Sequence, residues 1–414
     1  MKIAVIGGGI SGLGAGVILS PHHEVHLFES AGRLGGHANT VDIPEGAAHV
    51  AVDTGFLVYN ELNYPHLTAF FRFLNVETVN SDMSLSVRSV REDLEWAGTN
   101  LNTIFAQRRN LFRPSFLGLL KEILRFHRHA EKNLSVSRRH GLSLGELLVR
   151  ENYSQPFCQF YLLPIGAAIW STPEAGILDY PADTFLTFFL NHKLLQMNNR
   201  PVWRTVLGGS RNYVKKAQAK ISNVHLNAKV TAVKRSEGRV WLRTENGEAQ
   251  FDKVIFATHA PVTLQLLQNP NELEKAVLGA FQVEKNKGTL HRDPAGMPRN
   301  ARTWAAWNVM AGSGDKVSLT YHLNRLQPLP TTSQYFLTLN PTAALNPVLA
   351  EFAYDHPRFT REAVRAQSEL SKIQGQGGIH YAGAWTRYGF HEDGLLSAVN
   401  VAKALGAEPP WDLA

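Results

Sequence analysis

The feature of this sequence that most constrains its fold is a glycine-rich turn between two apolar segments near the N-terminus. Lys2 to Ile6 predicts a strand, Gly7 to Gly12 forms the turn, and a helix of small residues follows it. A second apolar segment then ends at Glu29. This order of strand, helix and strand is typical of a βαβ unit that binds a dinucleotide.

The residues of the turn have separate roles in such a unit. Gly7 permits the tight turn, Gly9 lets the backbone approach a pyrophosphate, and Gly12 lets the helix and the strand pack without a side chain between them. The free N–H groups at the start of the helix, at Ile10 and Ser11, face the same point as the positive end of the helix dipole. We therefore expect them to hold the diphosphate.

Glu29 supports the dinucleotide interpretation because it follows Gly12 by 17 residues at the end of an apolar strand. A carboxylate at this place accepts hydrogen bonds from ribose hydroxyls and repels a 2′-phosphate, which argues against NADP. A G-x-G-x-x-G pattern alone is a weak signal, and a glycine-rich turn without a nucleotide is the alternative. The strand, helix, strand and acid in register favour the dinucleotide.

The segment after Glu29 indicates which dinucleotide binds. It resembles the R-x-G-G segment of FAD enzymes in the flavin amine oxidase, protoporphyrinogen oxidase and phytoene desaturase superfamily, and NAD dehydrogenases lack it. In that superfamily the arginine and the paired glycines run along the ribityl and diphosphate part of FAD. The resemblance implies noncovalent FAD and adds these residues to its site: Ser30, Arg33, Leu34, Gly35 and Gly36.

Later segments carry the same resemblance: VDTGFLVYN, WRTVLGGSRNYV, FATHAP, LNRLQ and YGFHEDG. The last one leads into an expected helix from Leu395 to Leu405, whose N-terminus would stabilise negative charge on the flavin. The superfamily usually has Asp or Glu after the Ala-Gly pair, where this chain has Ala384. The resemblance implies these further contacts to FAD: Gly55, Val230, Ala257, Thr258, Gly383, Ala384, Gly394 and Leu395.

The chain is similar, almost end to end, to a bacterial group of amine oxidase-like proteins described as predicted NAD/FAD-binding proteins. Related domains occur beside or fused to cyclopropane-fatty-acid-synthase-like methyltransferases, and some relatives oxidise fatty acyl chains of membrane phospholipids. This association implies an acyl-lipid substrate and a lipid methyltransferase as a partner.

The expected fold is α/β, with a Rossmann-like FAD-binding domain of the glutathione-reductase type interleaved with an α+β substrate domain. We assign residues 1–60, 201–265 and 374–414 to the first domain and residues 61–200 and 266–373 to the second. The substrate domain is expected to contain a strand pair within Ser84 to Trp96 and aromatic-rich helices over residues 141–200. Its mixed sheet is expected to include Arg302 to Met310, Lys316 to Asn324 and Gln334 to Leu339.

The positive charge of the chain is concentrated in residues 104–140. Nine Arg or Lys residues against two Glu give this segment a net charge of +7, equal to that of the whole chain. Apolar residues lie between the cations, so the segment fits either an anionic lipid surface or an ordinary helix packed on the core. In the first case Arg108, Arg109, Arg113, Arg125 and Arg128 would face headgroups, and Phe112, Phe116 and Leu120 would enter their boundary. The sequence contains no recognisable nucleic-acid-binding module.

Three features bear on location. Cys158 is the only cysteine, the chain starts with a core strand instead of a signal peptide, and no apolar run is long enough for a spanning helix. We therefore expect a cytoplasmic protein that the basic segment would place on the inner face of the membrane.

Three functions remain open from the sequence. The first is an FAD-dependent oxidoreductase that removes hydride from an apolar chain, and the second is an amine oxidase, which in this superfamily has a lysine near the flavin, here Lys285 or Lys287. The third is a flavoprotein partner of a lipid-modifying enzyme without turnover of its own. The sequence offers these weak catalytic candidates: His291, His322, Tyr388, His391 and Glu392.

Overall fold

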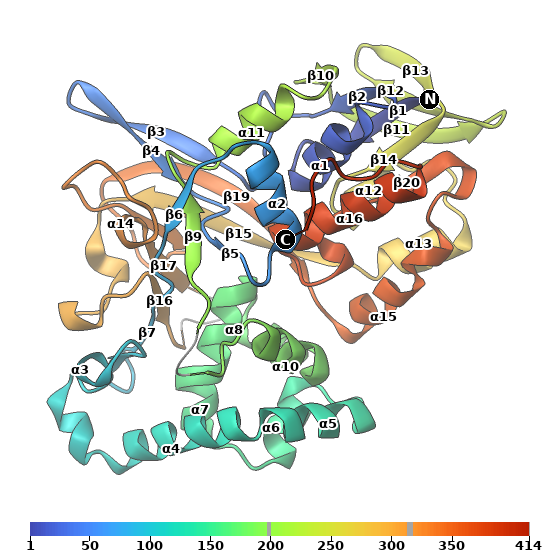
Figure 1. The fold of residues 1–414 in the computed structure, drawn as a ribbon. Coiled ribbons are helices and arrows are strands. Elements are labelled where there is room, and N and C mark those ends of the chain that lie inside the picture. Colours follow the sequence, from blue (N-terminus) through green and yellow to red (C-terminus); the bar gives the residue numbers. More distant parts are fainter. Residues whose placement is uncertain (197–199, 313–317, 414) are drawn as a thin grey trace.

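A five-stranded parallel sheet forms around the N-terminal glycine turn (Figure 1). The structure is a computed structural model that describes residues 1–196, 200–312 and 318–413. The strand order is β10-β2-β1-β14-β20, and every neighbouring pair is parallel. This is the order of a Rossmann-type sheet, in which ligands bind at the carboxyl ends of the strands. Its strands are β1 (Lys2–Ile6), β2 (Glu24–Phe28), β10 (Asn223–His225), β14 (Lys253–Phe256) and β20 (Ile379–Tyr381).

The first helix of the chain, α1 (Ile10–Leu19), packs closely against the last one, α16 (His391–Ala404). A Cβ atom on Gly14 would lie 2.5 Å from Cδ1 of Leu395, so the contact requires a glycine. The sequence placed the start of α16 at Leu395, and this was wrong by four residues. The helix begins at His391 because the Asp393 carboxylate accepts the N–H of Phe390 at 3.0 Å and caps it there.

Smaller antiparallel units flank the parallel sheet. The hairpin expected at Asn246-Gly247 is present, and Gly247 has the positive φ of 124° that such a turn requires. The strands of these units are β3 (Thr40–Glu45), β4 (Ala48–Asp53), β5 (Tyr59–Asn60), β6 (Thr78–Asn80), β9 (Trp203–Val206), β11 (Val230–Ser236), β12 (Arg239–Thr244) and β13 (Gly247–Phe251).

A seven-stranded mixed sheet, in the order β19-β15-β18-β17-β16-β7-β8, forms the second layer. It contains the strand pair expected within residues 84–96. The expected strand over 302–310 was wrong in its first part, because residues 301–303 form a 3-10 helix capped by the Asn300 side chain. Lys316 of another expected strand lies outside the described residues. The strands are β7 (Leu85–Ser89), β8 (Leu94–Ala97), β15 (Gln282–His291), β16 (Trp307–Met310), β17 (Ser318–His322), β18 (Phe336–Leu339) and β19 (Val348–Arg358).

A helical arm follows the edge strand β8 in the chain, and much of it lies at the bottom of Figure 1. Within the described ranges, no helix is both long enough and apolar enough to cross a bilayer. The arm comprises α3 (Leu101–Ile104), a 3-10 helix (Arg108–Phe112), α4 (Pro114–Arg128), α5 (Ala130–His140), α6 (Leu144–Arg150), α7 (Gln155–Phe157), a π-helical turn (Cys158–Leu162), α8 (Leu163–Trp170), α9 (Glu174–Leu178) and α10 (Ala182–Asn191). The other helices are α2 (Pro65–Phe73), α11 (Arg211–Gln218), α12 (Ala260–Leu266), α13 (Glu272–Gly279), α14 (Leu323–Leu326) and α15 (Arg361–Glu369).

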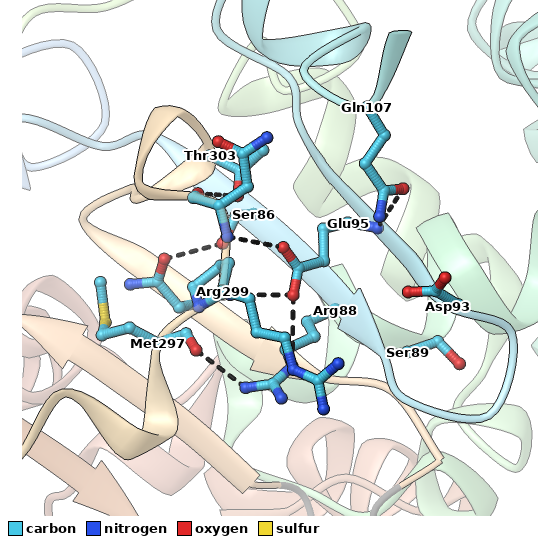
Figure 2. A network of polar contacts seen from close by, with 12 residues as sticks. Ser86, Arg88, Ser89, Asp93, Glu95, Gln107, Met297, Arg299 and Thr303 are labelled. Carbon is cyan, nitrogen blue, oxygen red and sulfur yellow. Dashed lines mark hydrogen bonds and ion pairs between the residues drawn. The ribbon is translucent and has the colours of Figure 1, made fainter. Parts of the chain in front are cut away.

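A polar network fastens the edge of the seven-stranded sheet where the helical arm begins (Figure 2). The carboxylate of Glu95, 5% exposed, accepts the N–H groups of Arg299 and Asn300 at 2.9 and 2.8 Å and pairs with the Arg88 guanidinium at 3.4 Å. The N–H of Glu95 in turn donates to the Gln107 side chain at 3.1 Å. The network therefore joins β7, β8 and the 297–303 loop to the segment that leads into α4.

Candidate functional site

A cavity of about 580 Å³ lies between the carboxyl ends of the parallel strands and the seven-stranded sheet. One part of its wall comes from the residues that the sequence assigned to FAD, and the other from α8, α10 and the sheet. The predicted cofactor residues that line it are Gly7, Gly9, Ile10, Ser11, Glu29, Ser30, Gly35, Gly36, Gly55, Val230, Ala257, Thr258, Gly383 and Ala384. The loop of the Gly-x-Gly turn and the C-terminal motif thus face the same space.

Gly9 shows that this space suits a diphosphate. A Cβ atom built on Gly9 would meet no protein atom within 4 Å, so it would project into the open cavity. Its φ of −73° is open to any residue, so backbone conformation does not require a glycine here. By contrast, a Cβ on Gly12 would lie 1.8 Å from the carbonyl oxygen of Gly7. The two glycines therefore differ: Gly12 serves packing, whereas Gly9 leaves room for a ligand.

Five of the predicted cofactor residues lie behind the cavity wall and shape it: Gly12, Arg33, Leu34, Gly394 and Leu395. The Arg33 guanidinium donates to the carbonyl oxygens of Leu34, Gly36 and Ala38, at 3.1 to 3.3 Å, and so holds the Gly-Gly loop. A Cβ atom on Gly394 would lie 2.8 Å from Cγ2 of Ile10, which shows how closely α16 approaches the glycine turn.

Glu29 is fixed by the loops on both sides of it. One carboxylate oxygen accepts the N–H of Gly8 at 2.8 Å, and the other accepts the N–H of Ala31 at 2.8 Å. The side chain also lines the cavity. The oxygen that accepts the Ala31 N–H also accepts the Ser30 hydroxyl at 3.1 Å. The oxygen that accepts the Gly8 N–H has a second lone pair, so Glu29 can order the turn and still accept a hydroxyl from a ligand.

Histidine side chains from five separate segments line the same cavity: His37, His192, His259, His356 and His391. Burial lowers the pKa of His37 to about 4 and the pKa values of His356 and His391 to about 3. The His391 ring stacks on the Phe56 ring, with ring centroids 3.8 Å apart, and its Nε2 lies 3.1 Å from the hydroxyl of Tyr213. Near neutral pH these imidazoles are therefore uncharged groups that offer one N–H and one acceptor nitrogen each.

The cavity wall away from the cofactor motifs is apolar. Among the described residues that line the cavity, the only Asp, Glu, Lys or Arg side chains are Glu29 and Lys229, both beside the nucleotide motifs. The remaining wall is built by aliphatic, aromatic and uncharged side chains, which include Met83, Ile169, Phe188, Leu194, Trp203 and Phe390. Of the aromatic residues in the helices expected over residues 141–200, Phe188 packs in the core and also lines the cavity, whereas Phe157, Phe185 and Phe189 are fully buried core residues.

A buried amide fixes the orientation of His356 in this wall. The Asn286 amide donates to the Ser171 carbonyl oxygen at 3.0 Å, and the same nitrogen lies 3.0 Å from Nδ1 of His356. A carbonyl oxygen can only accept, so this atom is the amide nitrogen and His356 accepts at Nδ1. The proton of the neutral imidazole is therefore on Nε2, and the ring belongs to the cavity wall.

Trp307 and Tyr321 also contribute polar groups to this wall, from the seven-stranded sheet. They face each other as a register pair of β16 and β17, with ring centroids 4.9 Å apart, and both line the cavity. The indole nitrogen of Trp307 is buried and has no hydrogen-bond partner within the described structure. With Nε2–H of His356, the wall therefore contains two N–H groups that have no acceptor among the described residues, and the Trp307 N–H is covered by the wall itself.

The catalytic candidates from the sequence lie in different places. Only His391 lines the cavity. His291 and His322 point to the other side of the sheet, where their Nε2 atoms contact Thr338 and Gln334 at 2.7 and 2.6 Å. The Tyr388 ring packs near Phe188, outside the cavity wall. Both oxygens of Glu392 accept N–H groups at the start of α2, at 3.0 and 2.9 Å, so this carboxylate caps a helix.

Polar residues of two other segments have structural explanations. Asp53, 1% exposed, accepts the N–H of Ser210 at 2.8 Å and the hydroxyl of Thr40 at 2.5 Å, so it joins the VDTG and LGGS segments. Lys285 and Lys287 are exposed on β15, whereas Asn286 between them is buried and faces His356. Strand alternation therefore turns an amide, and neither lysine, toward the cavity.

The comparisons with known proteins agree with this geometry. The sequence model of the flavin containing amine oxidoreductases matches residues 10–283. Among curated proteins, no sequence matches significantly.

Similar solved structures share the fold. The CLA-producing fatty acid isomerase from P. acnes has a TM-score of 0.68 at 13% identity, with 97% of this chain and 98% of that chain covered. Cyclohexylamine oxidase from Brevibacterium oxydans IH-35A has a TM-score of 0.69 at 13% identity, with 98% and 99% covered. Wild-type putrescine oxidase bound to putrescine has a TM-score of 0.67 at 13% identity, with the same coverage.

Proposed function

Because this chain belongs to the flavin-containing amine oxidoreductase family, we propose that it oxidises an apolar substrate, a fatty acyl chain of a lipid, in the cavity described above. The chain is an FAD-dependent oxidoreductase, and the substrate is the part that we propose. When bound, FAD would supply the acceptor for a hydride from one carbon of the chain. The neighbouring carbon would lose a proton to water or to the acceptor nitrogen of a neutral imidazole in the cavity, and the electrons of its C–H bond would form the double bond.

The observation that carries the proposal is the uncharged wall of the cavity. A protonated amine would find no carboxylate among the described lining residues other than Glu29, which is held at the nucleotide end. Burying a cation without a partner is costly, whereas burying an acyl chain against Ile169, Phe188 and Leu194 is favourable. The side chains of this wall would hold the chain in place and exclude water.

The polar groups of the wall favour a substrate with an acyl group over an amine. The neutral His356 imidazole offers an N–H donor, which suits a carbonyl or carboxylate oxygen. An amine oxidase of this family would be expected to place a lysine near the flavin, and here the inward residue of β15 is Asn286. One of the proteins with a similar fold is a fatty acid isomerase, which supports an acyl substrate.

Turnover with a panel of compounds tests this proposal. The FAD-loaded protein is mixed with phospholipids, free fatty acids and primary amines, and reduction of an artificial electron acceptor is followed. We expect turnover with acyl chains only. The variant Ile169→Trp should fill the cavity and lose this turnover while keeping the flavin spectrum, whereas Val149→Trp, at a surface position 82% exposed, should behave as the parent. Turnover with amines alone would favour the amine oxidase, and no turnover with any compound would favour a flavoprotein partner of a lipid methyltransferase.

We also expect FAD to be bound without a covalent link. Cys158 is the single cysteine, it does not line the cavity, and burial raises the pKa of its thiol to about 11, so it is a poor nucleophile. Acid precipitation of the yellow protein should therefore release intact FAD into the supernatant. Flavin that stays with the precipitated chain, located by mass spectrometry of its peptides, would contradict this expectation.

A further inference from the structure

Helix α4 has two apolar faces, and only one of them packs on the protein. Phe116, Leu119 and Phe126 are at most 2% exposed and pack into the core. Leu117 and Leu124, by contrast, are 44% and 48% exposed. An ordinary amphipathic helix has a single apolar stripe, so the second pair of leucines needs another explanation.

The outer leucines alternate with cations along one stripe. Leu117, Lys121, Leu124 and Arg128 follow one another at spacings of four, three and four residues, which places them on one face of the helix. All four are exposed, and within the described structure neither Lys121 nor Arg128 has an acidic partner. We call these four residues the outer stripe. Phe112, immediately before the helix, is 86% exposed.

Three other cations of this segment form ion pairs with acids of the protein. Arg109 pairs with Asp93 at 2.6 Å, and Arg113 pairs with Glu92 at 3.5 Å. Arg125 pairs with Glu122 at 3.1 Å, and its guanidinium lies over the Tyr153 ring at 4.0 Å. Three of the five arginines expected at a lipid surface therefore have acidic partners, and Arg108 donates to the Phe105 carbonyl oxygen at 2.8 Å. Phe116 is buried. The acid of α4, Glu122, is turned toward Ser154 and leaves the outer stripe purely cationic.

We propose that the outer stripe of α4, together with Phe112, docks the protein on an anionic membrane surface. The leucines and the phenylalanine would enter the headgroup boundary, while Lys121 and Arg128 stay at the level of the phosphates with their stems along the apolar part. A protein partner would need a continuous apolar patch, whereas a cation in every turn fits a layer of anionic headgroups. This inference stands on the surface of α4 and does not depend on which substrate enters the cavity.

Helix α4 is connected through packed side chains to the wall of the cavity. Figure 1 shows α4 at the edge of the helical arm, away from the parallel sheet. The Phe126 ring of α4 packs on the Phe157 ring of α7, with ring centroids 5.4 Å apart. From Phe157 the chain continues through the π-helical turn into α8, whose Ile169 lines the cavity. One continuous helical segment therefore runs from beneath the proposed membrane face to the substrate wall.

Sedimentation with vesicles tests the proposal on the FAD-loaded full chain. We expect the parent protein to co-sediment with phosphatidylglycerol vesicles at low salt, to be released by salt, and not to bind phosphatidylcholine vesicles. Lys121→Gln with Arg128→Gln should weaken partitioning about 25-fold, since each cation near the surface contributes roughly fivefold. Leu117→Ser with Leu124→Ser should weaken it as well, and neither pair should change the flavin spectrum.

Matched controls separate location from net charge and net hydrophobicity. Lys275→Gln with Lys372→Gln removes two exposed charges elsewhere, and Leu413→Ser removes a leucine that is 51% exposed. Both controls should bind vesicles like the parent. The proposal is overturned if the parent ignores anionic vesicles, if it binds neutral ones equally, or if the stripe variants bind like the controls. It also fails if the leucine variant changes only the oligomeric state, because the face would then join copies of the chain.

Discussion

Replacing Gly9 with valine is expected to leave a folded protein that has lost its FAD. A Cβ atom at this position meets no protein atom within 4 Å and projects into the cavity, so the branched side chain costs the apoprotein little. The diphosphate needs the same space. We expect affinity for FAD to fall by more than about a thousandfold, on the order of 4 kcal/mol.

Three other variants make this expectation specific. Gly118→Val, at a glycine of α4 that also has no atom within 4 Å of an added Cβ, should retain FAD. Gly12→Val should fail to fold, because its Cβ would lie 1.8 Å from the Gly7 carbonyl oxygen. Glu29→Ala removes charge-assisted hydrogen bonds of about 1.5 to 3 kcal/mol and should weaken FAD binding roughly ten- to hundredfold. Titration of each apoprotein with FAD, checked by circular dichroism, measures all four, and full retention by Gly9→Val would contradict the placement of the diphosphate.

The second large effect is acid unfolding of the apoprotein between about pH 6.5 and 4. Burial lowers the pKa of His127, His192, His291 and His380 to about 4, as it does for His37, and to about 3 for His356 and His391. The unfolded chain protonates these imidazoles near pH 6.5, whereas the folded chain does not. The free energy of unfolding therefore falls as the pH decreases through this window, by about 3 kcal/mol for each imidazole.

Three buried carboxyl groups act in the opposite direction. Burial raises the pKa values of Asp53 and Asp393 to about 6 and that of Glu392 to about 7. The folded chain therefore protonates these groups before the unfolded chain does, and their contribution to stability increases as the pH falls from 7 to 4. The seven imidazoles outnumber these three groups. We therefore expect a net loss comparable to the usual stability of a domain, about 5 to 15 kcal/mol.

Circular dichroism of the apoprotein as a function of pH measures the acid transition. His380→Phe removes a buried imidazole whose Nδ1 has no hydrogen-bond partner within the described structure, and it should move the transition to lower pH. His49→Gln, at an exposed position of β4, is the matched control and should leave the transition where it is. An apoprotein that remains fully folded at pH 4 would contradict the assignment of these histidines as buried and neutral.

Local patterns were sufficient to predict the nucleotide half of the fold. The turn from Gly7 to Gly12 and the strand over Lys2–Ile6 have signals within a few residues of each other, so no distant contact is needed to recognise them. The hairpin at Asn246-Gly247 is similar, because its turn chemistry is local. The sequence also placed the basic segment correctly as helical, over α4 and α5.

Distant contacts decide the parts that the sequence missed. The strand β15 (Gln282–His291) contains three charged residues and has no clear alternation, and its pairing with β19 makes it a strand. On β17 both faces are buried, so hydrophobicity could not show that Tyr321 faces the cavity and His322 the other side. His356 has no local signal at all, and its role follows only from Asn286, 70 residues away.

A single anaerobic turnover tests the central claim, oxidation of an acyl chain, most directly. The FAD-loaded protein is mixed with a phospholipid or its free fatty acid in the absence of oxygen, and the loss of flavin absorbance and the mass of the extracted lipid are measured together. We expect the flavin to bleach as one acyl chain per flavin loses two hydrogens, while primary amines leave the flavin oxidised. Bleaching by amines with the lipid unchanged, or a lipid altered without loss of mass while the flavin remains oxidised, would contradict the proposed oxidation.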